Sequence, residues 1–246
     1  MGVIKIDAYI LTGGEGTRVK ELTDKYRCQK HQIPINGIPF INYMTEWLYS
    51  TNLITKIYYL DAPGVGTAGA LKIASGINHF PFLMVYGDCF CKVDLWNAYR
   101  KMLQRRADMV VFTRVVTEPD YGWILEDYTR YYVGDSSSGG HIAEYQYSAR
   151  KYIRSHEATE YKTNIGTYLI GERAYEYIIN QPWRQQAAPI SPWIYCPGTL
   201  SLEHDLMEGD LFQVLKVDTY GTDDLYYYDV GTIDRVKKTE EQILKE

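Results

Sequence analysis

The sequence predicts an α/β fold in which helices cover both faces of a mainly parallel central sheet. Two observations lead to this prediction. Short apolar runs end in turn residues, and segments with apolar residues at helical spacing lie between them. The chain has 246 residues, of which 46% are hydrophobic and 23% are charged. This composition is typical of globular proteins, and the length suits one domain over residues 1–246.

The first elements alternate between strand and helix. Residues 3–11 form a mostly apolar run that predicts a buried strand, and a glycine-rich loop follows it. A helix is expected from Pro39, because the following apolar residues recur at helical spacing: Phe40, Ile41, Met44, Trp47 and Leu48. Residues 56–60 and 81–87 predict further buried strands. The stretch "GTAGALKIASGI" between them is suited to a helix that packs closely on the sheet.

The second half continues the pattern less regularly. Residues 94–106 predict a helix and 108–116 a strand, and then a tyrosine-rich region from about 117 to 170 suggests a small insertion of mixed, partly antiparallel strands. The C-terminal segment 232–246 is expected to form a helix that closes the domain. One face of that helix would carry Ile233, Val236, Ile243 and Leu244.

Composition excludes several classes of partner. The formal net charge is −5, from 26 basic and 31 acidic residues that are interspersed, so binding to nucleic acid or to an anionic membrane is not expected. No apolar run is long enough to span a membrane and no signal peptide is recognisable, which predicts a cytoplasmic protein. The four cysteines form no CxxC pair, so reduced thiols are expected and a zinc site is not.

The loop "LTGGEGTR" at residues 11–18 is the main functional signal. Glycines between a strand and a helix allow backbone N–H groups to approach phosphate oxygens. The loop lacks the dinucleotide pattern GxGxxG, because Val19 stands in the third position, and no GK[ST] follows as in a Walker loop. Two cations, Arg18 and Lys30, suit a polyphosphate ligand. A tight turn with a surface arginine would produce the same local pattern.

Together with six further motifs, this loop resembles the sugar-1-phosphate nucleotidyltransferases. The motifs follow in order along nearly the whole chain: Lys30 before "IPINGIPFINY", "GVGTAGAL" (64–71), "YGD" (86–88), "NIGTYLI" (164–170), "SLEHDL" (201–206) and "YDVGT" (228–232). The resemblance implies a Rossmann-like three-layer fold. It also implies the Mg²⁺-dependent reaction NTP + sugar 1-phosphate → NDP-sugar + pyrophosphate.

The resemblance also implies roles for individual residues. The implied catalytic residues are Arg18, Lys30 and Asp88, and the implied metal ligands are Asp88 and Asp229. The implied nucleotide site consists of Leu11, Gly13, Gly14, Glu15, Gly16, Thr17, Arg18, Asp61, Gly66, Thr67 and Ala68. The implied sugar-phosphate site consists of Tyr121, Gly122, Asn164, Gly166 and Glu203, with Lys151 as a weaker candidate. For each aspartate and glycine, a purely structural cap or turn is the alternative.

The expected substrates are GTP and a hexose or heptose 1-phosphate, because the "GTAGAL" segment with Asp61 before it is similar to mannose- and heptose-1-phosphate guanylyltransferases. Two alternatives remain open: a cytidylyltransferase that acts on a phosphocholine-like acceptor, and a catalytically silent regulatory homologue that binds a nucleotide sugar. A homodimer is possible. The chain departs from the family at Gln29, where proline is usual, and in the short separation of Gly14 from Gly66, which leaves room for only one strand between the first helix and "GTAGAL".

Overall fold

The computed structural model describes residues 5–14, 16–74, 76–116, 123–127, 141–146, 161–184, 198–222 and 226–245. Eight strands form one sheet in the order β4-β1-β5-β10-β7-β11-β9-β8. Their bounds are β1 Ile6–Leu11, β4 Ile54–Leu60, β5 Phe82–Tyr86, β7 Met109–Val116, β8 Trp123–Asp127, β9 His141–Gln146, β10 Tyr161–Ile170 and β11 Val217–Thr222. Strands β4, β1 and β5 are parallel, as are β7 and β11, whereas β10 lies antiparallel between β5 and β7.

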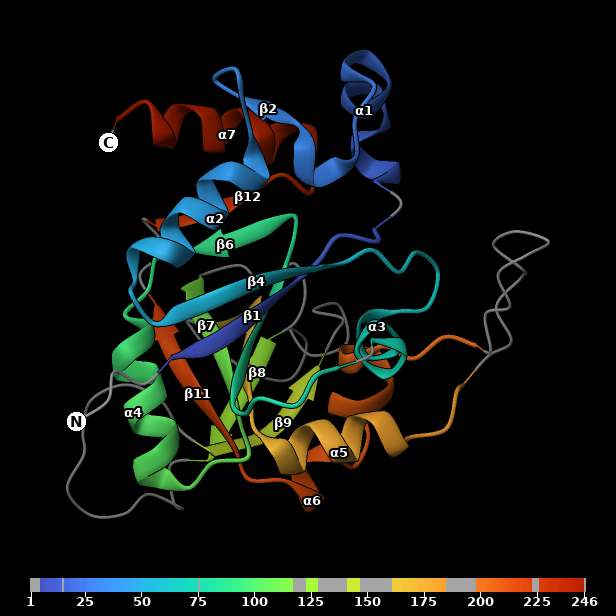
Figure 1. The fold of residues 1–246 in the computed structure, drawn as a ribbon, viewed down its shortest axis with the longest axis vertical. Helices are drawn as coiled ribbons and strands as arrows, with labels where there is room; N and C mark the ends of the chain where they lie inside the picture. Colours follow the sequence, from blue (N-terminus) through green and yellow to red (C-terminus); the bar gives the residue numbers. More distant parts are fainter. Residues whose placement is uncertain are drawn as a thin grey trace.

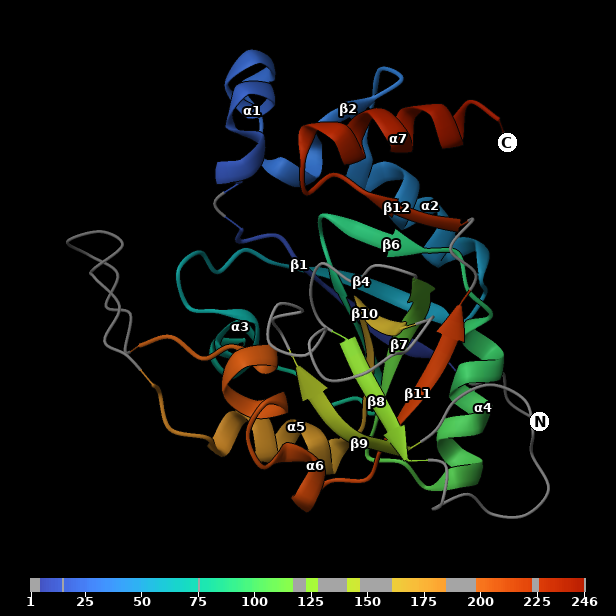
Figure 2. The same ribbon diagram turned by 180° about the vertical axis from the view of Figure 1, so that it is seen from behind.

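Helices cover both faces of this sheet (Figures 1 and 2). One face packs against α2 (Phe40–Ser50) and α4 (Leu95–Arg105). The other face packs against α3 (Thr67–Ile73), α5 (Glu172–Asn180) and α6 (Leu211–Val214). The three layers, and the mainly parallel direction of the central strands, confirm the predicted fold class.

Alternation along the strands explains why two cores form. In β5, Leu83 and Val85 belong to the core under α2 and α4, whereas Phe82 and Met84 belong to the core under α3 and α5. All four side chains have 0% exposure. A strand that is buried on both faces reads as a continuous apolar run, which is why residues 81–87 were recognisable from sequence.

Shorter elements surround the carboxyl edge of the sheet. They are η1 (Thr17–Val19), α1 (Lys20–Tyr26), η2 (Lys30–Gln32), β2 (Pro34–Ile35), β3 (Ile38–Pro39), β6 (Cys89–Cys91), the π-helical turn η5 (Leu202–Met207), β12 (Tyr227–Asp229) and α7 (Ile233–Ile243). Strands β6 and β12 pair antiparallel, with Asp229 opposite Cys89. The Val230 N–H donates to the Asp88 carbonyl at 2.9 Å, so segments distant in sequence meet here.

Most of the expected elements are present where the structure is described. Helix α2 buries all five of the apolar residues that predicted it. In the expected insertion, the described strands β8 and β9 pair antiparallel with each other and extend the main sheet. The prediction for Leu244 is wrong, because α7 ends at Ile243 and leaves Leu244 72% exposed. No helix in the described part of the chain has the length and apolarity needed to cross a membrane.

Gly66 fixes how α3 meets the neighbouring chain. Its φ is +79°, and a Cβ at this position would lie 2.5 Å from the Leu200 carbonyl oxygen. The same contact is held by hydrogen bonds, because Leu200 donates to the Val65 carbonyl and Gly69 donates to the Leu200 carbonyl, each at 2.8 Å. Only glycine allows this approach without a clash.

Gly66→Ala should therefore lower the free energy of unfolding by at least about 3 kcal/mol, since backbone strain and a steric clash add together. Gly37 is a matched control, because its φ is +83° but no atom lies within 4 Å of an added Cβ. Gly37→Ala should cost only the strain, about 1–2 kcal/mol. Urea unfolding of both variants measures the difference, and equal losses would contradict the proposed role of the Leu200 contact.

Candidate functional site

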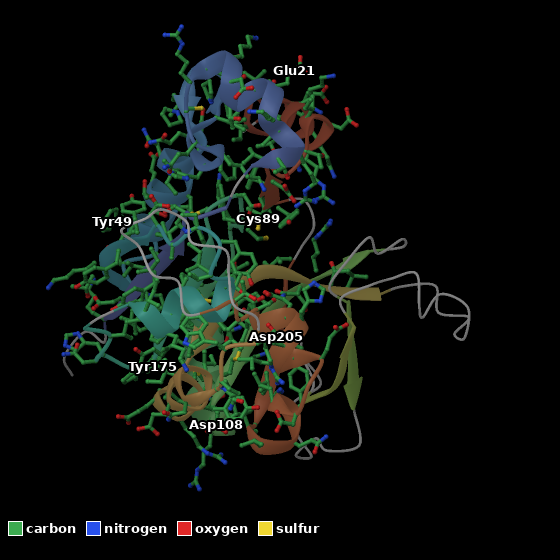
Figure 3. All side chains as sticks on the ribbon, turned by 90° about the vertical axis from the view of Figure 1, so that its right-hand side faces the viewer. Glu21, Tyr49, Cys89, Asp108, Tyr175 and Asp205 are labelled. Carbon is green, nitrogen blue, oxygen red and sulfur yellow. The ribbon has the colours of Figure 1, made fainter. Side chains whose placement is uncertain are left out.

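A cavity of 430 Å³ lies at the carboxyl ends of β1, β4 and β5. This is the edge at which ligands gather in open α/β sheets. Figure 3 views the side of the molecule that lies to the right in Figure 1, and the labelled Asp205 and Cys89 belong to η5 and β6. The lining residues are Leu11, Thr12, Gly13, Gly14, Lys30, His31, Leu60, Ala62, Gly64, Gly66, Thr67, Ala70, Tyr86, Gly87, Asp88, Thr199, Ser201 and Asp205.

Part of the glycine loop forms one wall of the cavity. Gly13 and Gly14 line it, and a Cβ at Gly13 would come within 2.5 Å of the Ala62 backbone carbonyl carbon. Gly16 takes a left-handed conformation, with φ +65°, immediately before η1. Thr17 and Arg18 are exposed on η1 and are not among the described lining residues. Glu15 lies outside the described residues.

Lys30 and Asp88 form an ion pair in the cavity. The Lys30 ammonium donates to Asp88 Oδ2, and the lysine and aspartate side chains are 11% and 30% exposed. Burial raises the pKa of Asp88, but the charge and hydrogen bond of Lys30 outweigh burial and lower that pKa overall. The capping box of η2, between Gln29 and Gln32, fixes the turn that carries Lys30. Gln29 therefore stabilises this turn, at the position where the family that the sequence resembles usually has proline.

Asp229 lies beside Asp88 but is almost enclosed. Its side chain is 7% exposed, and Oδ2 accepts from Tyr227 Oη at 3.0 Å and from Arg235 Nη1 at 2.9 Å. Oδ1 accepts from the Gly231 N–H. Burial and the nearby charge of Asp88 raise the pKa of Asp229, and Arg235 opposes that shift. The pairing of β6 with β12 thus brings two carboxylates together, and η2 and α7 each supply a basic partner to one of them.

The donor set of these two aspartates is compatible with Mg²⁺. Magnesium is often held by one or two carboxylates and completes its shell with water and substrate phosphates. Asp88 faces the cavity, and Asp229 Oδ1 uses one of its lone pairs for Gly231, so each residue has an oxygen to offer. The described residues contain no group of three or more His, Cys, Asp or Glu side chains arranged for a metal. A metal would therefore depend on oxygens of a bound phosphate.

The start of α3 supplies the opposite wall. Gly66 and Thr67 line the cavity, whereas Ala68 is fully buried behind them. Asp61 follows β4 and is not among the described lining residues, although its charge acts on His31, which does line the cavity. Burial lowers the pKa of His31, and Asp61 partly offsets this effect.

Three of the residues expected to contact the sugar lie beneath the cavity surface. The Asn164 amide donates to the Tyr168 hydroxyl, and Asn164 Oδ1 accepts from the Gly166 N–H at 2.9 Å. Glu203 is 6% exposed and accepts hydrogen bonds from Tyr168, Thr67 and Ser201. Asn164, Gly166 and Glu203 are brought together, but none is among the described lining residues. Tyr121, Gly122 and Lys151 lie outside the described residues.

Sequence reasoning missed several lining side chains, among them His31, Tyr86, Ser201 and Asp205. Two of them, His31 and Tyr86, could have been found from their neighbours in the sequence. His31 directly follows Lys30, and Tyr86 directly precedes the "GD" of the third strand. Ser201 and Asp205 have no such local signal, because they reach the cavity through the approach of η5 to α3.

The structure thus combines a three-layer α/β sheet with a glycine-walled cavity at its carboxyl edge, and structural comparison finds solved proteins with the same fold. HddC from Yersinia pseudotuberculosis is similar, with a TM-score of 0.69 and 19% identity over 97% of this chain and 99% of that one. UTP-bound UGPase from Acinetobacter baumannii is similar at a TM-score of 0.73 and 12% identity, over 99% and 95%. A putative glucose-1-phosphate thymidylyltransferase from Bacillus anthracis gives 0.66 and 15%, over 96% and 94%.

A scan with protein-family models and a search of curated protein sequences both found no match. At 12–19% identity the solved structures establish the fold. They confirm the fold that the sequence motifs implied.

The buried carboxyl of Glu203 should make stability depend on pH. Burial raises its pKa from 4.5 to about 7, and the Thr67 hydrogen bond only partly opposes this. The folded protein then holds a proton that the unfolded chain releases, so the free energy of unfolding should fall as pH rises from 4.5 to about 7. The contribution of this one group is roughly 3 kcal/mol.

Glu203→Gln should remove that part of the pH dependence. Urea unfolding at a series of pH values through this window compares the variant with the wild type. Asp24→Asn, an exposed substitution on α1, serves as the control. Parallel stability curves for wild type and Glu203→Gln would contradict the raised pKa.

Proposed function

We propose that this protein is a nucleotidyltransferase that joins an NTP to a sugar 1-phosphate and releases pyrophosphate. The observation that carries the proposal is the Lys30–Asp88 ion pair inside a glycine-walled cavity at the carboxyl edge of the sheet. Known proteins with this fold support it, since they include an HddC complex with GMP-PN, a UTP-bound UGPase and a UDP-glucose pyrophosphorylase complexed with UDP-glucose.

The reaction places two anions next to each other. An oxygen of the sugar phosphate attacks the α-phosphorus, a new P–O bond forms, and the bond to the bridging oxygen of pyrophosphate breaks. Positioning and charge stabilisation supply most of the catalysis in such phosphoryl chemistry. The backbone N–H groups at Gly13, Gly14 and Gly16, together with Arg18, would bind the triphosphate.

Lys30 would provide the charge at the reacting phosphates. In the free protein its ammonium is held by Asp88, and a phosphate oxygen entering the cavity offers an alternative acceptor within the same space. Asp88 and Asp229 would hold Mg²⁺, which would supply positive charge to stabilise the pyrophosphate leaving group. Arg235 donates to the Asp229 carboxylate and helps to fix its position.

The proposed substrates are GTP and a hexose or heptose 1-phosphate. The "GTAGAL" segment and Asp61 are the residues on which the choice of guanine depends, and the HddC complex with GMP-PN supports it. The protein is further proposed to act in nucleotide-sugar biosynthesis as a single catalytic domain.

The proposal predicts pyrophosphate release from one pair of substrates. GTP, CTP, UTP, ATP and dTTP would be tested with a panel of sugar 1-phosphates and with phosphocholine, in the presence of Mg²⁺. We expect release with GTP and a manno-configured hexose or heptose 1-phosphate. Release only with CTP and phosphocholine would favour the cytidylyltransferase, and binding of a nucleotide sugar without release would favour the regulatory homologue.

Asp88→Asn should lower the rate of release by at least about a hundredfold, because it removes a charge that faces the reacting phosphates. Asp24→Asn is the matched control, since Asp24 is an exposed residue of α1 that pairs with Lys20. Its activity should equal that of the wild type. Full activity of Asp88→Asn would exclude the proposed metal site.

Chelation with EDTA should abolish release, and added Mg²⁺ should restore it. The expected loss is at least about a hundredfold, because the carboxylates of Asp88 and Asp229 would otherwise repel the phosphates. Activity that persists in EDTA would show that Lys30 and Arg18 suffice to neutralise the leaving group.

A further inference from the structure

Glu203 organises three hydroxyl groups around itself. Its Oε1 lies 2.7 Å from the Tyr168 hydroxyl, and its Oε2 lies 2.9 Å from the Thr67 hydroxyl and 3.2 Å from the Ser201 hydroxyl. An ionised carboxylate can only accept hydrogen bonds, so all three hydroxyl groups must donate their protons to it. The direction of each hydrogen bond is therefore fixed by the charge on Glu203.

The remaining contacts of these hydroxyl groups agree with this direction. The Thr67 hydroxyl oxygen accepts from the Leu202 N–H at 2.8 Å, and the Ser201 hydroxyl oxygen accepts from the His204 N–H at 3.1 Å. Each of these two oxygens has a second lone pair, and both residues line the cavity. With their protons turned inward, Thr67 and Ser201 present acceptors to the cavity.

The charge on Glu203 also sets the direction of the hydrogen bond between Tyr168 and Tyr86. Tyr168 has one hydroxyl proton and gives it to Glu203, the closer acceptor, while the Asn164 amide donates to the Tyr168 oxygen. The hydroxyl oxygens of Tyr168 and Tyr86 are 3.4 Å apart, and because the Tyr168 proton goes to Glu203, a hydrogen bond between the two uses the proton of Tyr86. Tyr86 lines the cavity and likewise presents oxygen lone pairs to it.

We propose that Glu203 is a positioning residue that makes Thr67, Ser201 and Tyr86 an acceptor wall, which binds hydroxyl groups of the substrate. Asp205 lines the same cavity and adds a carboxylate, so this wall disfavours phosphate. The phosphates bind instead at the basic side of the cavity, where Lys30 lies. The inference rests on the proposed function and adds an orientation: substrate hydroxyl groups bind toward η5 and α3.

This role differs from direct contact between Glu203 and the sugar. Both carboxylate oxygens are engaged by protein hydroxyl groups, and Glu203 is not among the described lining residues. Burial also raises the pKa of Glu203 to about 7, so the wall forms progressively as pH rises through that value. The test is therefore made about one unit above that pKa, near pH 8.

The experiment is a double-mutant cycle on binding. Glu203→Gln replaces one acceptor oxygen by an N–H donor and must reverse at least one hydroxyl group. Tyr86→Phe and Thr67→Val each remove one hydroxyl group of the wall. Calorimetry would measure the Kd of GTP and of mannose 1-phosphate for each single and double variant. The two ligands distinguish ribose or base donors from sugar hydroxyl groups.

Glu203→Gln should weaken binding of one of these ligands by about tenfold, the effect of one or two hydrogen bonds. That loss should shrink in the Tyr86→Phe or the Thr67→Val background, because Glu203 acts through these hydroxyl groups. Losses that add in both backgrounds would overturn the proposal, since Glu203 would then affect binding without acting through either hydroxyl group.

Two controls keep the outcomes separate. Thermal unfolding reports whether each variant folds, and Tyr168→Phe replaces Glu203→Gln in the cycle with Tyr86→Phe if the glutamine variant does not. Additive losses in that cycle would also overturn the proposal. Wild-type protein that binds neither GTP nor mannose 1-phosphate would refute the proposed substrates, and the acceptor wall with them, whereas binding with additive losses refutes the wall alone.

Discussion

The site depends on how three carboxyl groups are compensated beside one cavity. Removing a carboxylate from water is costly unless charges or hydrogen bonds replace the solvent. Asp88 is paired with Lys30, Asp229 is enclosed by Arg235, Tyr227 and a backbone N–H, and Glu203 is surrounded by hydroxyl groups. The outcomes differ, because Lys30 lowers the pKa of Asp88, whereas burial raises the pKa of Asp229 and of Glu203 despite their charged or hydroxyl partners.

Local patterns made much of the fold predictable. The five apolar residues of α2 and the continuous apolar run of β5 follow from spacing alone. The end of α7 was not predictable, because an apolar residue at Leu244 fits the helical face whether or not the helix reaches it. The place of β10 between β5 and β7 was also hidden, since strand order depends on tertiary pairing that no local pattern records.

The candidate site was predictable where its residues follow a strand directly. Gly13 and Asp88 are of this kind, and both line the cavity. Glu203 was singled out only through family resemblance, and sequence could not indicate that its oxygens would be taken by Thr67, Ser201 and Tyr168. Those contacts arise because η5, α3 and β10 converge, which is a property of packing rather than of any one segment.

The pairing of β6 with β12 has a consequence for the order in which the protein folds. These strands, Cys89–Cys91 and Tyr227–Asp229, lie far apart in the sequence, and the Thr239 hydroxyl of α7 further anchors the Asp229 backbone. During synthesis, the glycine loop, Lys30 and Asp88 leave the ribosome long before β12 does. Asp88 can therefore acquire its acidic neighbour only after β12 has been translated, and nascent chains that lack β12 have a cavity without the second carboxylate.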